Sequence, residues 1–225
     1  MKKAVVLLSG GLDSLTCLVI AQSQGYEVHA ISFDYGQKHR SELVAAKKIT
    51  ERYNAKHKII EMHALGKLGG SALTDDSISV KDFKGDDKIP ETYVPARNIV
   101  FLSIALGFAE IIDAEAVFIG ANAIDYSGYP DCRPEFIEAF RKVADTGTKA
   151  GVEGQAIKIL APIIDLTKSE IIQLGTTLGA EYGLSVSCYR ADEKGHACGE
   201  CDSCHFRKQG FIEAEFPDPT RYIVK

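Results

Sequence analysis

The chain has 225 residues, of which 45% are hydrophobic and 25% are charged, and its formal net charge is −5. A chain of this length buries roughly 70% of its unfolded surface, so one substantial core with at most a small appendage is expected. The composition excludes a collagen-like, coiled-coil or disordered chain. The Lys and Arg residues are scattered, which argues against a nucleic-acid partner because such a partner requires a basic face.

The first residues superficially resemble a secretion signal, because two lysines precede an apolar run. The run covers only Ala4–Leu8 before Ser9-Gly10-Gly11, and it is shorter than the apolar region of a signal peptide. No stretch approaches the ~20 apolar residues that span a bilayer. We therefore expect a soluble, cytoplasmic protein without membrane contact, whose first apolar run is a buried strand.

Short apolar runs alternate with stretches of helical spacing along most of the chain. The runs predicted as strands are Ala4–Leu8, Val28–Phe33, Lys58–Ile60, Ala116–Ile119 and Ile157–Leu160. Four helices are predicted from the apolar stripes Leu15/Leu18/Val19, Leu43/Ala46/Ile49/Tyr53, Ile99/Leu102/Leu106/Ala109 and Ile171/Leu174/Leu178. This alternation predicts a doubly wound α/β domain with a parallel sheet over residues 1–183.

Two long gaps interrupt the alternation, at residues 62–96 and 120–133. The first contains several glycines and two acidic pairs but no clean period. Loops of this length inside a compact domain are usually functional. We expect a lid or a mobile segment at 62–96 and part of a ligand site at 120–133.

The hexapeptide Ser9–Ser14, with the sequence SGGLDS, follows the first predicted strand and opens the first predicted helix. Ligands of open α/β sheets bind beyond the carboxyl ends of the strands, and a helix N-terminus there offers unpaired N–H groups and a positive dipole end. The glycines allow the backbone to approach a ligand closely. The hexapeptide therefore predicts an anion cradle, although Gly-Gly between a strand and a helix is often only a tight turn.

This loop differs from two common phosphate-binding loops, because it has neither the lysine of a Walker A loop nor the G-x-G-x-x-G of a Rossmann turn. The Asp13 carboxylate would repel bare phosphate, so we expect it to cap the helix or to meet Mg²⁺. The complete S-G-G-x-D-S string resembles the PP-loop of the ATP pyrophosphatase superfamily, whose fold is adenine nucleotide alpha hydrolase-like. That resemblance implies cleavage of ATP between its α and β phosphates. It implies these ATP-binding residues: Leu8, Ser9, Gly10, Gly11, Leu12, Asp13 and Ser14.

A second candidate phosphate ligand lies in Thr167-Lys168-Ser169-Glu170. The T-x-x-E spacing is a capping box, which places Lys168 in the first turn of a helix, where a cation opposes the helix dipole. The plain interpretation is a solvated surface lysine. The segment is similar to L-T-K-[SA]-E segments near the end of PP-loop domains, which favours contact with phosphate.

Four of the six cysteines lie in the last fifth of the chain. Cys198, Cys201 and Cys204 form C-x-x-C-x-x-C, and Cys188 lies ten residues upstream. Four thiolates complete a tetrahedral structural zinc site. The rival is an iron–sulfur cluster, but the ferredoxin pattern continues to a fourth Cys followed by Pro, which is missing here. We predict one structural zinc ion that fastens residues 184–225 onto the α/β domain without a chemical role.

Three further segments carry a more specific resemblance: Phe33–Gln37 (FDYGQ), Val94–Asn98 (VPARN) and Gly120–Pro134 (GANAIDYSGYPDCRP). With the PP-loop and the cysteines, they make the chain resemble the 7-cyano-7-deazaguanine synthase family of the queuosine precursor pathway, essentially from end to end. The residue before Arg97 is often Gly in that family and is Ala96 here.

The resemblance implies an ATP-dependent ligase that converts 7-carboxy-7-deazaguanine and ammonia to 7-cyano-7-deazaguanine through acyl-adenylate and amide intermediates. It also implies Mg²⁺ with ATP and a homodimer. The implied catalytic residues are Asp13, Arg97 and Lys168. The implied substrate-binding residues are Arg97, Asn98, Asn122, Asp125, Asp131 and Arg133. For any single Asn or Asp in Gly120–Pro134, turn formation is about as expected as ligand contact, and Pro134 can occupy the first turn of a helix.

Two other functions stay open. Cys132 can be a sulfur carrier, as in PP-loop tRNA thiolases, although the acidic charge and the lack of an appended RNA-binding domain argue against this. A zinc-stabilised ATP-binding module without turnover is the non-enzymatic alternative. Pyrophosphate release that depends on substrate separates the module from the two enzymes, and the effect of Cys132→Ser separates the enzymes from each other.

Overall fold

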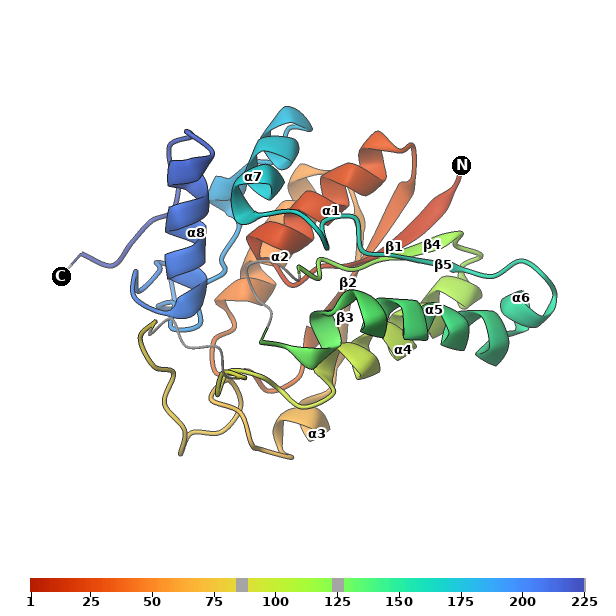
Figure 1. The fold of residues 1–225 in the computed structure, drawn as a ribbon, viewed down its shortest axis with the longest axis horizontal. Coiled ribbons are helices and arrows are strands. Elements are labelled where there is room, and N and C mark those ends of the chain that lie inside the picture. Colours follow the sequence, from red (N-terminus) through yellow and green to blue (C-terminus); the bar gives the residue numbers. More distant parts are fainter. Residues whose placement is uncertain (84–88, 123–127, 225) are drawn as a thin grey trace.

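The computed structural model describes residues 1–83, 89–122 and 128–224. These residues form a five-stranded sheet with the strand order β3-β2-β1-β4-β5, in which every pairing is parallel (Figure 1). The strands are β1 (Lys3–Leu7), β2 (Glu27–Asp34), β3 (Lys56–Glu61), β4 (Ala116–Phe118) and β5 (Lys158–Leu160). The central strand β1 pairs Ala4 with Val28 of β2 on one side and with Ala116 of β4 on the other.

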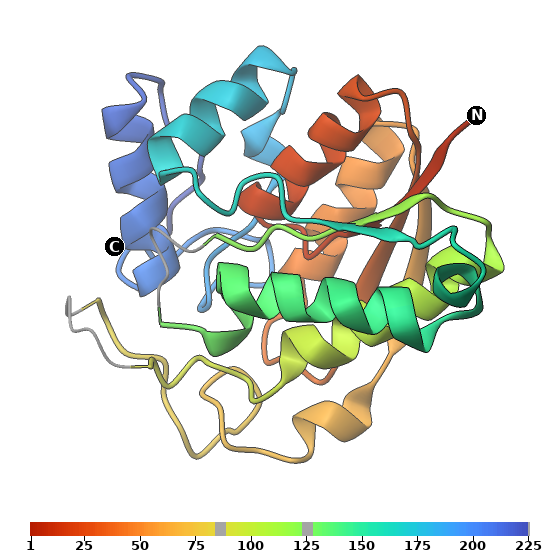
Figure 2. The same cartoon turned by 45° about the vertical axis from the view of Figure 1, so that its right-hand side comes forward.

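Helices cover both faces of this sheet. They are α1 (Leu12–Ser23), α2 (Ser41–Arg52), α3 (His63–Gly66), α4 (Arg97–Ile111), α5 (Pro134–Gly147), α6 (Lys149–Val152), α7 (Lys168–Thr177) and α8 (Asp202–Glu213), with 3₁₀ turns η1 (Pro130–Cys132) and η2 (Tyr182–Leu184). Helices α1, α2 and α7 lie on one face with α8 packed against α7, and α4 and α5 lie on the other face (Figures 1 and 2). The doubly wound α/β fold is confirmed.

Strand β1 is apolar from Ala4 onward because both of its faces are covered. Ala4 and Val6 pack into the layer of α1, α2 and α7, whereas Val5 and Leu7 pack into the layer of α4 and α5. A strand of a parallel sheet is buried on both faces and therefore has no polar side in its sequence. The two layers form the two large hydrophobic clusters of the described residues.

The five predicted strands and the four predicted helices are all present, and the strand bounds differ from the predicted ones by at most two residues. Helices α5 and α8 were not predicted. The buried residues of α5 are only Ile137, Phe140 and Ala144, within an otherwise polar stretch. The buried face of α8 consists of Cys204, Arg207, Gly210 and Phe211, which is not an apolar stripe. Pro134 does occupy the first turn of a helix.

The segment 62–96 joins β3 to α4 and reaches the C-terminal part of the chain. The Phe83 amide donates to the Glu200 carbonyl oxygen at 3.1 Å, and the Phe83 ring stacks on His205 with centroids 3.8 Å apart. Asp82 forms an ion pair with Arg190. The described part of this long segment is therefore fastened to the cysteine-rich region.

Residues 184–224 pack against the α1 and α7 layer. The Val186 amide donates to the Gly10 carbonyl oxygen at 2.9 Å, and the Phe211 ring meets the Tyr182 ring edge-on. The cysteine-rich segment thus touches the end of the loop that precedes α1. Within the described ranges, no helix is long and apolar enough to cross a membrane.

Candidate nucleotide site and metal centre

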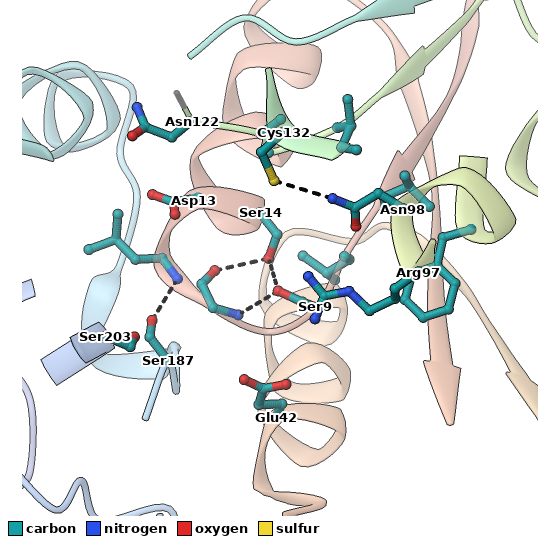
Figure 3. A pocket seen from close by; sticks show the side chains of 18 of the residues that line it. Ser9, Asp13, Ser14, Glu42, Arg97, Asn98, Asn122, Cys132, Ser187 and Ser203 are labelled. Atoms are coloured by element: carbon teal, nitrogen blue, oxygen red, sulfur yellow. Dashed lines mark hydrogen bonds between the residues drawn. The ribbon is translucent and has the colours of Figure 1, made fainter. Parts of the chain in front are cut away.

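A pocket opens at the carboxyl ends of β1, β2 and β4, lined by Leu8, Phe33 and Gly120 from the ends of those strands (Figure 3). The chain winds from β1 to β2 and β3 on one side and to β4 and β5 on the other. This reversal next to β1 is the topological switch point at which open α/β sheets bind ligands. The predicted site residues that line the pocket are Leu8, Ser9, Gly11, Leu12, Asp13, Ser14, Arg97, Asn98, Asn122 and Lys168.

The loop before α1 is held by its own hydroxyl groups. Ser14 Oγ donates to the Gly11 carbonyl oxygen at 2.9 Å and accepts from the Gly10 amide at 3.3 Å. The Gly11 amide donates to Ser9 Oγ at 3.2 Å. Among the residues that the structure describes, the amides of Asp13 and Ser14 have no hydrogen-bond acceptor. An α-helix N-terminus with free amides and a positive dipole end is suited to an anion.

Gly10 is the residue that lets this loop fit against α2. Its φ of +96° lies in the region that L-residues with a side chain avoid. A Cβ atom at this position would lie 2.1 Å from the Glu42 carbonyl oxygen and 3.0 Å from the Ala46 amide nitrogen. Both atoms belong to backbone, which cannot move aside cheaply. Gly10 therefore determines how closely the loop approaches the first turn of α2.

Asp13 and Lys168 meet across the pocket although they are far apart in the sequence. Lys168 Nζ lies 2.7 Å from Asp13 Oδ1, and its side chain is only 14% exposed, so the interpretation as a solvated lysine is wrong. The predicted capping box of α7 is present, with Thr167 and Glu170 each bonded to the other's backbone. Gly210 of α8 makes room for the lysine stem, because a Cβ there would lie 2.4 Å from Lys168 Cγ.

Arg97 enters the pocket from the first residue of α4. Burial opposes its charge, but Tyr35, Tyr129, Cys132 and Asp131 together raise the pKa of Arg97 above its usual range. The guanidinium is therefore a permanent positive charge inside the pocket. The preceding residue, Ala96, has a φ of +58°, a conformation that favours glycine. This backbone conformation is a physical reason why the family that the sequence resembles often has glycine at position 96.

Asn98 and Asp131 bind each other. The Asn98 amide donates to Asp131 Oδ2 at 2.9 Å, and its side-chain Nδ2 donates to the Asp131 carbonyl oxygen at 3.0 Å. Asp131 is buried and does not line the pocket, and its Oδ1 has no partner among the described atoms. Asn98 Nδ2 also contacts Cys132 Sγ at 3.3 Å. In this structure Asp131 holds the first turn of α4.

The remaining predicted substrate residues are placed differently from one another. Asn122 lines the pocket, and its Nδ2 donates to the carbonyl oxygens of Ile163 and Leu166, which fixes the turn before α7. Arg133 is exposed and does not line the pocket. Asp125 lies outside the described residues.

Burial dominates the titration of two further groups in the pocket wall. The pKa of Glu42 is raised by burial to about 7, against the lowering effect of Arg97. The pKa of Cys132 is raised by burial, and then by Asp131, to about 12. The Cys132 thiol is therefore protonated at neutral pH. Glu42 was not predicted as a site residue, because in the sequence it is one more acidic residue in the first turn of a helix.

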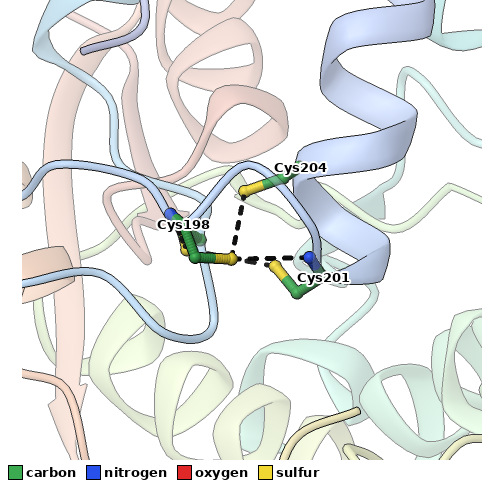
Figure 4. Close-up of side chains that lie close together, drawn as sticks. Cys198, Cys201 and Cys204 are labelled. Atoms are coloured by element: carbon green, nitrogen blue, oxygen red, sulfur yellow. Dashed lines mark hydrogen bonds between the residues drawn. The ribbon is translucent and has the colours of Figure 1, made fainter. Parts of the chain in front are cut away.

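The four clustered cysteines do come together in space, and Figure 4 shows Cys198, Cys201 and Cys204 of this group. Their sulfur atoms all lie within 4.8 Å of one another, with Cys188 and Cys201 3.9 Å apart and Cys198 and Cys204 also 3.9 Å apart. All four are free of disulfides. A tetrahedron with metal–sulfur bonds of 2.3 Å has edges of ~3.8 Å. The cluster therefore has the size of a four-thiolate metal site.

Backbone amides around the cluster are arranged to stabilise thiolates. Cys188 Sγ accepts from the amides of Arg190 at 3.3 Å and Cys198 at 3.2 Å. Cys198 Sγ accepts from the amides of Glu200 and Cys201, both at 3.4 Å. Hydrogen bonds from outside the ligand set orient metal ligands and favour their charged form. The cysteine cluster is therefore suited to hold a metal ion.

Helix α8 and a short chain of hydrogen bonds link the cysteine cluster to the nucleotide loop. Arg207 follows Cys204 by one helical turn in α8. Its Nη1 donates to Ser185 Oγ at 2.8 Å and to Ser187 Oγ at 3.5 Å. Ser187 Oγ in turn accepts from the Leu12 amide at 3.1 Å. Ser187 was not predicted as a site residue, since a lone serine beside a cysteine gives no signal in the sequence.

The fold and the loop place this chain in a class of proteins. A U34-tRNA thiolase, NcsA, from Methanococcus maripaludis, solved with its [4Fe-4S] cluster, superposes with a TM-score of 0.50 and 17% identity over 95% of this chain and 73% of that one. Identity at this level shows the fold alone. Parallel sheet, S-G-G-x-D-S loop and switch-point pocket define a nucleotide-binding α/β protein of the PP-loop superfamily.

The particular family follows from the sequence comparisons. Residues 3–215 match the model of the family described as queuosine biosynthesis protein QueC. A Coxiella burnetii protein named 7-cyano-7-deazaguanine synthase is 62% identical over 100% of both chains. A protein of the same name from Alcanivorax borkumensis is 62% identical over 99% of this chain and 100% of its own. The chain belongs to the QueC family, and the resemblance found in its sequence is confirmed.

Proposed function

We propose that this protein is an ATP-dependent carbon–nitrogen ligase that converts 7-carboxy-7-deazaguanine and ammonia to 7-cyano-7-deazaguanine in queuosine biosynthesis. The observation that carries the proposal is full-length identity of 62% with proteins of that name. It is supported by a pocket that places an anion-binding loop beside a fixed positive charge, Arg97. The reaction needs both the anion-binding loop and the positive charge, because a triphosphate and a carboxylate are both negatively charged and must approach each other.

The proposed reaction has three parts. The substrate carboxylate attacks the α-phosphate of ATP, pyrophosphate leaves, and an acyl adenylate forms. Ammonia then displaces AMP and gives the amide. The amide oxygen attacks the α-phosphate of a second ATP and pyrophosphate leaves again. Loss of AMP and of two protons then gives the nitrile. The protein contributes mainly by positioning the reactants and by stabilising charge.

On the phosphate side, we assign ATP binding to Leu8–Ser14 and charge neutralisation to Lys168. The free amides of Asp13 and Ser14 suit the departing pyrophosphate. Asp13 holds Lys168 at 2.7 Å and thereby keeps its ammonium group at the loop. When bound with ATP, Mg²⁺ would offset triphosphate charge, and the Asp13 carboxylate is a suitable oxygen ligand for it.

On the substrate side, we assign the carboxylate and the purine-like ring to the wall formed by Arg97, Asn98 and Asn122. A permanently charged guanidinium suits a carboxylate through paired hydrogen bonds. Asp131 acts through Asn98, which it holds in place. For Asp125 and Arg133 the assignment rests on family resemblance alone.

We further propose that Cys188, Cys198, Cys201 and Cys204 hold one structural zinc ion per chain. Sulfur spacing and amide donors support four thiolate ligands, and a closed four-thiolate site leaves no position for chemistry. In this proposal residues 1–183 form the ATP-binding domain and residues 184–225 a zinc-binding segment packed on it. Measured zinc content of the purified protein tests the metal directly.

We also propose a cytoplasmic homodimer. The outward row of α4 carries Ile99, which is 45% exposed, and Ile111, which is 79% exposed, with the small residues Ser103 and Gly107 between them. A row of this kind suits packing against a second copy of the same helix. Light scattering after size-exclusion chromatography distinguishes a dimer from a monomer.

The alternative of a tRNA thiolase draws on one observation, the position of Cys132 in the pocket wall. A sulfur carrier must form a thiolate, whereas burial raises the pKa of Cys132 to about 12. We expect Cys132→Ser to keep most of the nitrile synthesis. Loss of all turnover in this variant, with its fold intact, would favour the thiolase.

The test of the proposed function is mass spectrometry of a reaction with purified protein, Mg-ATP, ammonium and 7-carboxy-7-deazaguanine. We expect the nitrile to appear with about two AMP for each product molecule, because each of the two oxygen atoms leaves on an adenylate. An unchanged acid with intact ATP, from folded and metal-loaded protein, contradicts the proposal. ATP binding without turnover would then leave the non-enzymatic module.

A further inference from the structure

The proposed function requires a proton acceptor that none of the assigned residues supplies. Attack of a carboxylate on ATP moves no proton, since the carboxylate is already ionised. Addition of ammonia does release a proton. The nitrogen forms a bond to the carbonyl carbon and loses one proton. The bond from that carbon to the oxygen of AMP then breaks, and AMP leaves with the electron pair. Conversion of the amide to the nitrile releases two further protons.

Two carboxyl groups line the pocket among the described residues, Asp13 and Glu42. Asp13 is engaged by Lys168 at 2.7 Å, and its negative charge is needed to hold that ammonium group. Glu42 has no hydrogen bond or ion pair among the described residues, although Arg97 acts on it through the pocket. Of these two groups, Glu42 is therefore the one whose oxygen atoms are available to a ligand.

The position of Glu42 in the fold places it beside the phosphate loop. It is the second residue of α2, and its own backbone carbonyl oxygen is in such close contact with Gly10 that no side chain fits there. Figure 3 shows its carboxyl group facing the loop that carries Ser9 and Ser14, with Arg97 on the adjacent wall. The same contact that shapes the phosphate loop thus holds the backbone of Glu42 beside that loop.

We propose that Glu42 is the proton acceptor of the amination step. Its carboxylate takes one N–H proton as ammonia adds to the acyl adenylate, and the partly buried side chain returns that proton to solvent before the amide is activated. It then serves the two proton releases of the dehydration in the same way. This inference rests on the proposed function and names the residue that the carbon–nitrogen bond-forming step of that function needs.

The charges around Glu42 fit this role. Burial raises its pKa to about 7, and the guanidinium of Arg97 from α4 limits that rise. Tyr35, which follows β2, also faces it and has a raised pKa through burial, so it stays neutral. Asp13, Lys168 and Arg207 line other parts of the same pocket. A base whose pKa lies near the working pH is the most effective proton acceptor.

The experiment separates steps with and without a proton transfer, using Glu42→Gln in the full-length metal-loaded protein. Exchange of labelled pyrophosphate into ATP, with 7-carboxy-7-deazaguanine and no ammonia, reports adenylation. Single-turnover formation of the amide after addition of ammonia reports amination. We expect exchange within about threefold of the wild type and amination slower by about 10²-fold or more, as for loss of a general base. Glu42→Asp should recover part of the amination rate.

Glu51→Gln is the matched control, because Glu51 lies on the same helix but is exposed and away from the pocket. It should leave both rates unchanged. Loss of exchange in Glu42→Gln to the same extent as amination would overturn the inference and make Glu42 a ligand of ATP or of its Mg²⁺. Amination at the wild-type rate would also overturn it. Failure of the wild type to make the nitrile is a different result, which removes the proposed function itself.

Discussion

The two sides of the pocket are built in different ways. The phosphate side consists mainly of one contiguous stretch, Leu8–Ser14, whose hydroxyl groups bond to its own backbone. The opposite side combines residues from four separate places, Tyr35, Arg97, Asn122 and Cys132. A contiguous loop needs only its flanking strand and helix to form, whereas the opposite wall exists only when several loops are held in register. The loop Leu8–Ser14 also makes long-range contacts to α2 and to the cysteine-rich residues 184–224. Substitutions at these contacts test whether the loop forms independently of them.

The largest effect is expected from disruption of the four-cysteine cluster, which we propose holds zinc. Cys201→Ser removes one of the four sulfur atoms proposed as zinc ligands, and the chain of contacts from Arg207 through Ser187 to the Leu12 amide then loses its support. Structural zinc contributes folding free energy directly, so we expect a lower melting temperature, less than one zinc per chain and loss of ATP turnover by more than about 100-fold. Cys132→Ser, which lies outside the cluster, should retain the metal. If Cys201→Ser still turned over ATP, the loop Leu8–Ser14 would form without support from the cysteine-rich residues 184–224.

Gly10→Ala tests the contact with α2. The new Cβ would lie 2.1 Å from a backbone oxygen at a φ of +96°, so we expect a loss of roughly 2–4 kcal/mol in the free energy of unfolding from strain and overpacking. Gly11→Ala is the matched control, because its φ is −82° and its closest neighbours lie at 3.4 Å. Urea unfolding measures both, and equal destabilisation of the two variants would contradict the structure.

Gly210→Ala asks whether α8 positions Lys168. A Cβ there would lie 2.4 Å from Lys168 Cγ and 2.8 Å from its Cβ, so the lysine stem must shift and its bond to Asp13 must weaken. We expect a drop of roughly tenfold in pyrophosphate exchange, corresponding to ~1.4 kcal/mol of transition-state stabilisation. Gly183→Ala, where the closest atom is at 3.6 Å, should change little. An unchanged exchange rate in Gly210→Ala would show that α8 does not position Lys168.

The raised pKa of Glu42 predicts opposite effects of pH on amination and on stability. The carboxylate forms above about pH 7, so amination, measured at constant free ammonia, should fall as the pH drops below that value. A carboxyl group whose pKa is higher in the folded chain stabilises the fold at low pH and loses this contribution as the pH rises from about 4.5 to about 7. At pH 8 the free energy of unfolding of Glu42→Gln should therefore exceed that of the wild type by on the order of 1 kcal/mol. At pH 4 the variant should have no such advantage. Thermal melting at the two pH values checks the sign.

The smallest effect concerns the wall opposite the phosphate loop. Ala96 has a φ of +58° directly before Arg97, and alanine in that region is less favourable than glycine by about 1 kcal/mol. Ala96→Gly should raise the free energy of unfolding by up to that amount and leave adenylation unchanged. Ala105→Gly, in the middle of the same helix, should lower it. A destabilised Ala96→Gly protein would mean that the backbone there is not strained.

Much of this site was predictable because its motifs are local. The SGGLDS hexapeptide after an apolar run, the capping box at Thr167–Glu170 and the spacing of the last three cysteines each belong to one stretch of chain. Helix α8 was not predicted because its buried face holds cysteines, an arginine and a glycine instead of an apolar stripe. Glu42, Ser187 and Gly210 were missed for a related reason, since each acts on a residue that is distant in the sequence.

The sequence by itself determined the parallel α/β fold, the anion-binding loop, the four-cysteine cluster and the family, because strand and helix periodicity, glycine at special backbone angles and ligand spacing are properties of neighbouring residues. Only the tertiary structure decided that Lys168 meets Asp13, that Asp131 supports Asn98, and that Glu42 is left available in the pocket. These pairings depend on how separate elements pack around one core, and their charge states depend on burial that the folded chain creates.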